Sequence, residues 1–151
     1  MKNLFLILAS VLLQAAATAQ DAGKITDIDS KVAAIKSDLK NYRAEDFKYP
    51  TYILKTTYYE NKTIKAVKVF VVDNNVNKTL MEYFYNGQMI YHEQIWTDMS
   101  GKVVHTELSY LSNHHLIKWT RDNEAFGKDY ESWKWWDKQL CESSKSQRKN
   151  T

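Results

Sequence analysis

The stretch Tyr83-Phe84-Tyr85-Asn86-Gly87-Gln88-Met89 decides the fold, because Asn-Gly between aromatic and apolar runs is the strongest short signal for a β-hairpin. Both central residues of a type I′ turn need positive φ, which Asn and Gly tolerate better than other residues. The stretch therefore predicts two antiparallel strands joined by a two-residue turn at Asn86-Gly87.

The same pattern recurs on either side, beginning at Tyr58 and at Tyr110. Each copy has Tyr, then an apolar or aromatic residue, then Asn three residues after the Tyr, and an aliphatic residue or Met three residues further on. A recurring unit of this kind predicts a repeated supersecondary structure, here one hairpin per copy. We expect an antiparallel meander of about six strands, at roughly 52–60, 63–72, 78–85, 88–97, 102–112 and 115–119.

On these residues, the chain resembles exported bacterial proteins built from tyrosine and Asn-Gly hairpin repeats, akin to MORN-type repeats. The likeness covers about residues 52–119 and rests on Tyr83 to Gly87 and on Tyr110 to Trp119. Lys62 and His114 stand where the other two copies would have the turn glycine. The resemblance implies a hairpin fold and an exported setting, because such proteins are mostly known as non-enzymatic or uncharacterised.

Helical patterns flank the predicted strands. One stripe, spaced by three and four residues, contains Ile25, Ile28, Val32, Ile35, Leu39 and Tyr42. It predicts an amphipathic helix that packs on the chain's own sheet, with pairing to a partner helix as the alternative. A second stripe, broken near Gly127, contains Phe126, Tyr130, Trp133, Trp136 and Leu140. The predicted fold class is therefore α+β, with an N-terminal helix and a C-terminal helical segment on the sheet and one sheet face more fully covered.

The first nineteen residues have the three parts of a cleavable signal peptide: Lys2, an apolar run over residues 4–13, and small residues ending at Ala19. The run is about half as long as a membrane-spanning helix, so we expect no transmembrane anchor after cleavage. The expected organisation is a signal peptide at 1–19, a single domain at 20–142 and a flexible basic tail at 143–151. The expected location is secreted or periplasmic.

The charge, the cysteine content and the lack of known catalytic motifs argue against several classes of function. The formal net charge of +3 is close to balance, which argues against a nucleic-acid partner. Cys141 is the only cysteine, so the chain can form no internal disulfide; we expect a small buried hydrophobe there, with a reactive thiol as the alternative. The sequence has no Gly-rich phosphate loop, nucleophile elbow or HExxH motif. We therefore expect no cofactor and favour a non-enzymatic role.

Turns at 86–87, 98–101 and 113–114 give the strands a provisional register. One face then carries a predicted core of Phe84, Met89, Tyr91, Ile95, Val104, Leu108, Tyr110, Ile117 and Trp119. On the other face His92 lies opposite Glu107, and Gln94 lies opposite His105. Two histidines and a carboxylate are ligands of non-haem iron or open zinc sites. The alternative to a metal site at His92, His105 and Glu107 is a solvated polar face, because a one-residue slip would move every side chain across the sheet.

The polar face also offers a binding surface, with Gln94 and Ser109 on the strands. Trp135 lies off the helical stripe and is the best candidate for an exposed contact, since aromatic side chains stack on sugars and anchor protein interfaces. Most of the other aromatic residues are expected in the core. We expect a binding or interaction module of the bacterial periplasm or cell surface, with an unidentified envelope protein or glycan as partner. The alternatives are a metal-dependent enzyme and a structural envelope component.

Overall fold

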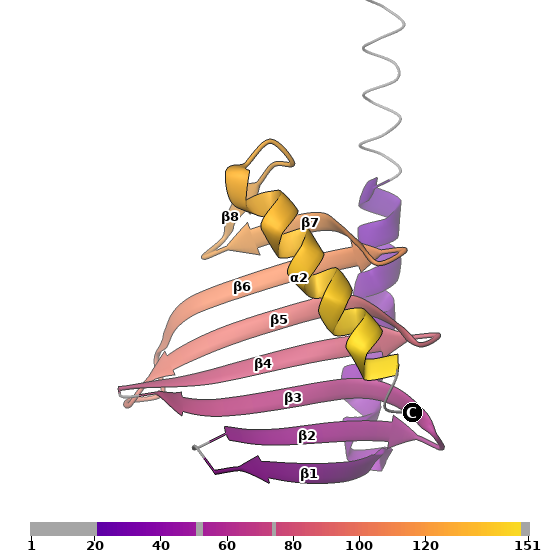
Figure 1. Ribbon diagram of the computed structural model, residues 1–151, viewed down its shortest axis with the longest axis vertical. Helices are drawn as coiled ribbons and strands as arrows, with labels where there is room; N and C mark the ends of the chain where they lie inside the picture. Colours follow the sequence, from indigo (N-terminus) through magenta and orange to yellow (C-terminus); the bar gives the residue numbers. More distant parts are fainter. Residues whose placement is uncertain (1–20, 51–52, 74, 149–151) are drawn as a thin grey trace, which may run out of the picture.

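The computed structural model describes residues 21–50, 53–73 and 75–148, with side chains as far as Lys145. The predicted signal peptide, residues 1–19, lies outside the described residues. An N-terminal helix over residues 21–38 is followed by a short 3-10 helix, eight strands and a second helix (Figure 1). The bounds are η1 Leu39–Asn41, β1 Arg43–Tyr49, β2 Ile53–Glu60, β3 Thr63–Asp73, β4 Val76–Tyr85, β5 Gln88–Asp98, β6 Val103–Ser112, β7 His115–Arg121, β8 Glu124–Phe126 and α2 Glu131–Arg148. Neither described helix is long and apolar enough to cross a membrane.

The strands form one antiparallel sheet in which each pairs with its neighbour in sequence, from β1 at one edge to β8 at the other. The predicted meander and the α+β class are confirmed, but the sheet has eight strands where we expected about six. The two additional strands lie at the edges. β1, with the sequence RAEDFKY, is exposed at every position and carries little hydrophobic signal, and β8 is only three residues long. Short or charged edge strands of this kind protect a sheet from pairing with other chains.

The repeated Asn residues form the turns that the sequence predicts. Asn61, Asn86 and Asn113 all have positive φ, at 57°, 49° and 52°, and each opens a two-residue turn between paired strands. The second turn residue also has positive φ in two of the three hairpins, at Gly87 (70°) and His114 (66°). The β7–β8 hairpin, whose turn is Asp122-Asn123, uses the same geometry without being part of the repeat.

Each repeat also contains a β-bulge, which the sequence did not predict. The pairing register shifts directly after the repeat tyrosine, between Tyr83 and Phe84 in the middle copy, so that Ile90 is an extra residue on the facing strand. The copies starting at Tyr58 and Tyr110 have the same shift. Because a bulge reverses the side-chain alternation beyond it, Met89 and Tyr91 face opposite sides of the sheet.

The bulges explain why the predicted single core face is wrong. Seven of the nine residues assigned to it divide between the cores on the two sides of the sheet. Phe84, Met89 and Trp119 belong to the core under α2, whereas Tyr91, Leu108, Tyr110 and Ile117 belong to the core under the N-terminal helix. Val104 is itself a bulged residue and is exposed. Each face of the sheet therefore carries its own helix.

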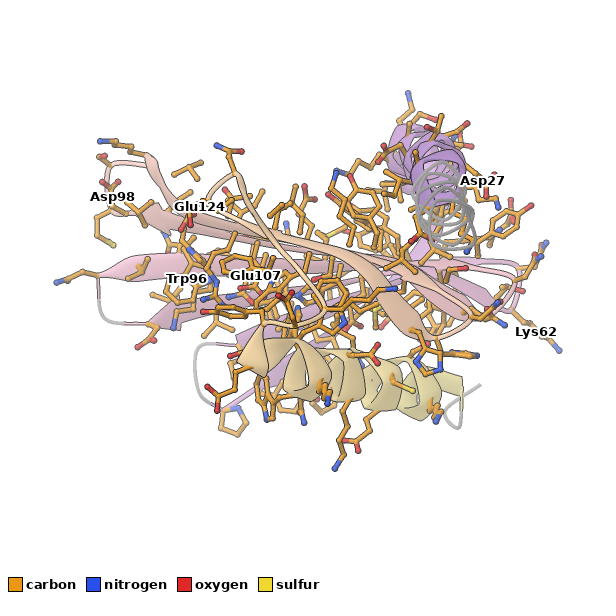
Figure 2. The ribbon with its side chains drawn as sticks, turned by 90° about the horizontal axis from the view of Figure 1, so that it is seen from above. Asp27, Lys62, Trp96, Asp98, Glu107 and Glu124 are labelled. Carbon is orange, nitrogen blue, oxygen red and sulfur yellow. The ribbon has the colours of Figure 1, made fainter. Side chains whose placement is uncertain are left out.

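The molecule has three layers, with the two helices on opposite sides of the sheet (Figure 2). The apolar stripe of the N-terminal helix packs on a row of tyrosines that includes two repeat tyrosines, Tyr83 and Tyr110. Ile28, Val32 and Ile35 are buried against these two and Tyr91. The prediction that this helix packs on the chain's own sheet is confirmed. The helix α2 runs diagonally across the other face, from the β7–β8 edge towards the centre of the sheet (Figure 1).

Polar side chains of α2 bind the same backbone position in two hairpin repeats. The Leu116 N–H donates to Asp137 Oδ1 at 2.6 Å, and the equivalent Met89 N–H donates to Ser144 Oγ at 3.2 Å. Seven residues separate the two acceptors, a rise of about 10.5 Å along a helix. The two donors lie on β7 and β5, two strands apart, a spacing of about 9.6 Å. The spacing of the two acceptors along the helix thus nearly equals the spacing of the two donor strands, so α2 can make both hydrogen bonds at one position on the sheet.

The C-terminal part differs from the prediction at both ends. Phe126, predicted to begin the helical segment, is instead the last residue of β8, because the Asp122-Asn123 turn returns the chain to the sheet. The helix α2 begins at Glu131 and continues to Arg148, so residues 143–148 are helical where a flexible tail was expected. Ser143 and Ser144 are held by the sheet, and Ser144 is fully buried. The half-buried Cys141 lies on this helix as a free thiol.

Candidate functional site

A cleft of about 250 Å³ lies between the first turns of α2 and the three strands β5, β6 and β7. The strands supply its polar floor, because Gln94, Glu107 and Arg121 pair directly across neighbouring strands and form one row. In Figure 2 Glu107 lies on the α2 side of the sheet, near the beginning of that helix. The complete lining is Gln94, Glu107, Trp119, Arg121, Ser132, Trp135 and Trp136.

An ion pair dominates the floor of the cleft. Glu107 is only 6% exposed, and its Oε2 accepts from Arg121 Nε at 3.1 Å. His105 Nε2 lies 3.9 Å from the same oxygen, and its Nδ1 lies 2.9 Å from Asp122 Oδ2. Asp122 also accepts from the Thr106 N–H, and this backbone hydrogen bond is the main reason why the pKa of the Asp122 carboxyl is below its ordinary value. Both charges on the floor of the cleft are therefore neutralised within the protein.

Three indole rings complete the lining of the cleft, Trp119 from β7 and Trp135 and Trp136 from α2. Trp119 is buried in the core, with its ring centroid 6.4 Å from that of Trp136. Trp136 in turn stacks on Trp135, with centroids 5.8 Å apart and an interplanar angle of 18°. The Trp136 indole N–H donates to Ser109 Oγ at 2.9 Å, which fixes the ring. The series ends at Trp135, which is 61% exposed on an ordered helix, as the sequence predicted.

Of the predicted binding residues, the structure brings Gln94 and Trp135 together in the cleft. Ser109 lies beneath Trp136 and is fully buried, so it supports the wall of the cleft and cannot meet a ligand directly. Sequence reasoning missed Arg121, because the predicted strand ended at residue 119 and left Arg121 in a loop. Its signal was present, since Arg121 follows Trp119 at the two-residue spacing of one strand face.

The predicted register between β5 and β6 is wrong by two residues. His92 lies opposite Ser109, and Gln94 lies opposite Glu107. Two local features cause the difference. The connecting loop is one residue shorter than expected, because Asp98 accepts from the Ser100 and Lys102 N–H groups while Gly101 has a φ of 85°. A bulge at Val104 then adds a second residue of shift.

The structure does not assemble His92, His105 and Glu107 as a set of metal ligands. Within residues 21–50, 53–73 and 75–148, no group of three or more His, Cys, Asp or Glu side chains is placed to hold a metal ion. His92 is 3% exposed, packs edge-on against Trp136, and has no hydrogen-bond partner on either ring nitrogen among the described residues. Burial lowers its pKa from 6.5 to about 4. The metal-site hypothesis therefore gains no support from this geometry.

Comparison with protein-family models, with curated proteins and with solved structures found no match to this chain. The resemblance to exported hairpin-repeat proteins therefore stays a prediction, and the cleft itself is the main guide to function.

Proposed function

We propose that the chain is an exported, non-enzymatic binding module of the bacterial periplasm or cell surface, and that it holds its ligand in the cleft beneath α2. The observation that carries this proposal is the position of Trp135, which is 61% exposed on an ordered helix at the mouth of a polar cleft. An exposed indole held in place by a neighbouring ring presents a large contact area with little side-chain entropy to lose on binding.

The ion pair on the floor of the cleft favours binding over catalysis. Arg121 and His105 both lie beside the Glu107 carboxylate, so this carboxylate is already engaged on the protein side. A general base needs a carboxylate oxygen that is free to accept a proton from the substrate, and one oxygen of Glu107 already accepts from Arg121. The same engaged groups are suited to recognition, because their orientation is fixed before the ligand arrives.

Affinity capture tests the proposal. The full chain is produced by export from a bacterium, immobilised, and exposed to an extract of bacterial envelope, alongside the variant Trp135→Ala. We expect the wild type to retain a specific envelope component and Trp135→Ala to lose it.

The matched control is Phe47→Ala, which removes another exposed aromatic side chain on β1 at the far edge of the sheet. Retention that persists in Trp135→Ala and disappears in Phe47→Ala would move the site to the opposite edge and refute the assignment of the cleft. The mass of the exported chain tests the proposal that the protein is exported. Export predicts the loss of residues 1–19, and an intact N-terminus in the exported fraction contradicts export.

A further inference from the structure

The cleft combines two kinds of surface that few ligands match together. Its α2 wall is planar and apolar, formed by Trp136 and the exposed Trp135. Its floor is polar and carries both acceptors and donors: the Glu107 carboxylate, the Arg121 guanidinium and the Gln94 amide. A pyranose ring has the complementary form, because its C–H groups make an apolar face and its hydroxyl groups, which donate and accept, surround the edge.

Charge further limits the ligand. Glu107 and Arg121 are bonded to each other at 3.1 Å, so the floor offers no excess charge to attract an anion or a cation. An anionic ligand would be repelled by the Glu107 carboxylate, and a cationic ligand would be repelled by the Arg121 guanidinium. The pair can still accept and donate hydrogen bonds through its remaining lone pair and N–H positions. A neutral ligand rich in hydroxyl groups satisfies these positions without separating the two charges.

The position of the cleft disfavours a peptide. Extended peptides bind most readily by adding a strand to an open sheet edge, where backbone N–H and C=O groups are free. The cleft instead lies over β5, β6 and β7, and each of these strands is paired on both sides. Its floor therefore presents side chains and no free strand edge. Its volume of about 250 Å³ is also smaller than a typical pocket for a drug-sized molecule.

We infer that the cleft beneath α2 is a subsite for one sugar ring of a neutral oligosaccharide, which stacks on Trp135 and bonds through its hydroxyl groups to Gln94, Glu107 and Arg121. This inference rests on the proposed binding function and names the class of its ligand. The rest of the glycan would extend out of the cleft past Trp135, whose ring is open to solvent.

Calorimetric titration of the exported full chain tests the inference. The probes are cellotetraose, maltotetraose, mannotetraose and chitotetraose, with trigalacturonate as an anionic sugar and an uncharged tetrapeptide as controls. We expect at least one neutral oligosaccharide to bind with a Kd of about 1 mM or lower, and neither control to bind at this concentration.

Three variants locate the binding site. Trp135→Ala should weaken binding about tenfold or more, and Trp135→Phe should recover part of the loss because it keeps an aromatic ring. Gln94→Leu should also weaken binding about tenfold, because it removes both a donor and an acceptor from the floor. Phe47→Ala should bind like the wild type. Urea unfolding of each variant establishes that a loss of binding does not reflect loss of the fold.

The outcomes separate this inference from the proposed function. If no neutral oligosaccharide binds at about 10 mM, or if binding is unchanged in Trp135→Ala, the sugar subsite is refuted. If the envelope component captured by the wild type is lost in Trp135→Ala while no sugar binds, the proposed binding function stands and only the ligand class is wrong. If the anionic sugar or the peptide binds best, the cleft selects a charged or peptide ligand and the inference of a neutral sugar is refuted.

Discussion

Replacing His92 with leucine removes the buried titratable group beneath α2 and should make the protein resist acid better. Both ring nitrogens of His92 are buried without a hydrogen-bond partner among the described residues, and burial lowers the pKa to about 4 from the ordinary 6.5. The unfolded chain therefore takes up a proton at this histidine as the pH falls through 6.5, whereas the folded protein does so only near pH 4. Protonation thus favours the unfolded state between these values.

The magnitude follows from the two pKa values. At about 1.36 kcal/mol for each pKa unit, the wild type should lose about 2 kcal/mol of unfolding free energy between pH 7.5 and 5, and about 3 kcal/mol by pH 4. Glu82 lies directly opposite on β4 and acts in the other direction, because burial raises the pKa of its carboxyl above 4.5, with Ser143 partly opposing this shift. This carboxyl is also present in His92→Leu, so the comparison between the two proteins isolates the histidine.

The assay is urea unfolding followed by tryptophan fluorescence at pH 7.5, 6.5, 5.5, 5.0 and 4.5. The difference in unfolding free energy, His92→Leu minus wild type, should rise by about 2 kcal/mol between pH 7.5 and 5. A difference that stays constant over this range would refute the reasoning, whatever the stability of the variant at neutral pH.

Three further predictions test the hairpins and the packing of α2 by urea unfolding. His114 has a φ of 66°, so His114→Gly should relieve backbone strain but also remove the contact of its ring with Ser144 Oγ at 3.3 Å, leaving the stability within about 0.5 kcal/mol of the wild type. Lys62→Gly, in a turn position without positive φ, should destabilise the protein by about 0.5–1 kcal/mol, and a larger loss in His114→Gly than in Lys62→Gly would contradict the turn geometry. Asp137→Leu removes the acceptor of the Leu116 N–H and should cost about 1–3 kcal/mol, but Asp137→Asn should keep most of the stability because it retains an acceptor oxygen. Leu140→Ala should cost about 2–5 kcal/mol because this side chain is buried between α2 and the sheet, and a loss below about 1 kcal/mol would argue against that packing.

The sequence predicts the hairpins well because their signals are local. Asn86-Gly87 needs only its own backbone preferences to form a turn, and the N-terminal stripe at Ile28, Val32 and Ile35 needs only a helix of ordinary period. Trp135 could also be assigned to the surface because it lies off the helical stripe. These features depend on neighbours a few residues away, so one sequence is enough to identify them.

The faces of the sheet depend on information that the residue pattern does not contain. In the run from Met89 to Tyr91 all three residues are apolar, so nothing in the sequence marks Ile90 as the bulged one. Each bulge changes the register by one residue, and a single unrecognised bulge transfers every later side chain to the other face. This is why His92 was expected on an open polar face but is buried by α2.

The candidate site was predictable only in part for the same reason. Gln94, Glu107 and Trp135 were identified individually from the sequence, but their meeting with Arg121 in one cleft depends on the bulge at Val104 and on the diagonal path of α2. The path of α2 is set by the hydrogen bonds of Asp137 and Ser144 to the repeats, which join positions far apart in the chain.

The indole N–H signals of the tryptophans give the most direct test of the cleft as the binding site. In a heteronuclear NMR titration of the ¹⁵N-labelled protein with the neutral oligosaccharides, we predict that the signals of Trp135 and Trp136 shift. The signal of Trp133, which is buried against the sheet and does not line the cleft, should stay in place. Assignment follows from replacing each tryptophan with phenylalanine. If the signals of Trp135 and Trp136 do not shift with any of the oligosaccharides, or if the Trp133 signal shifts and theirs do not, the cleft beneath α2 is not the binding site.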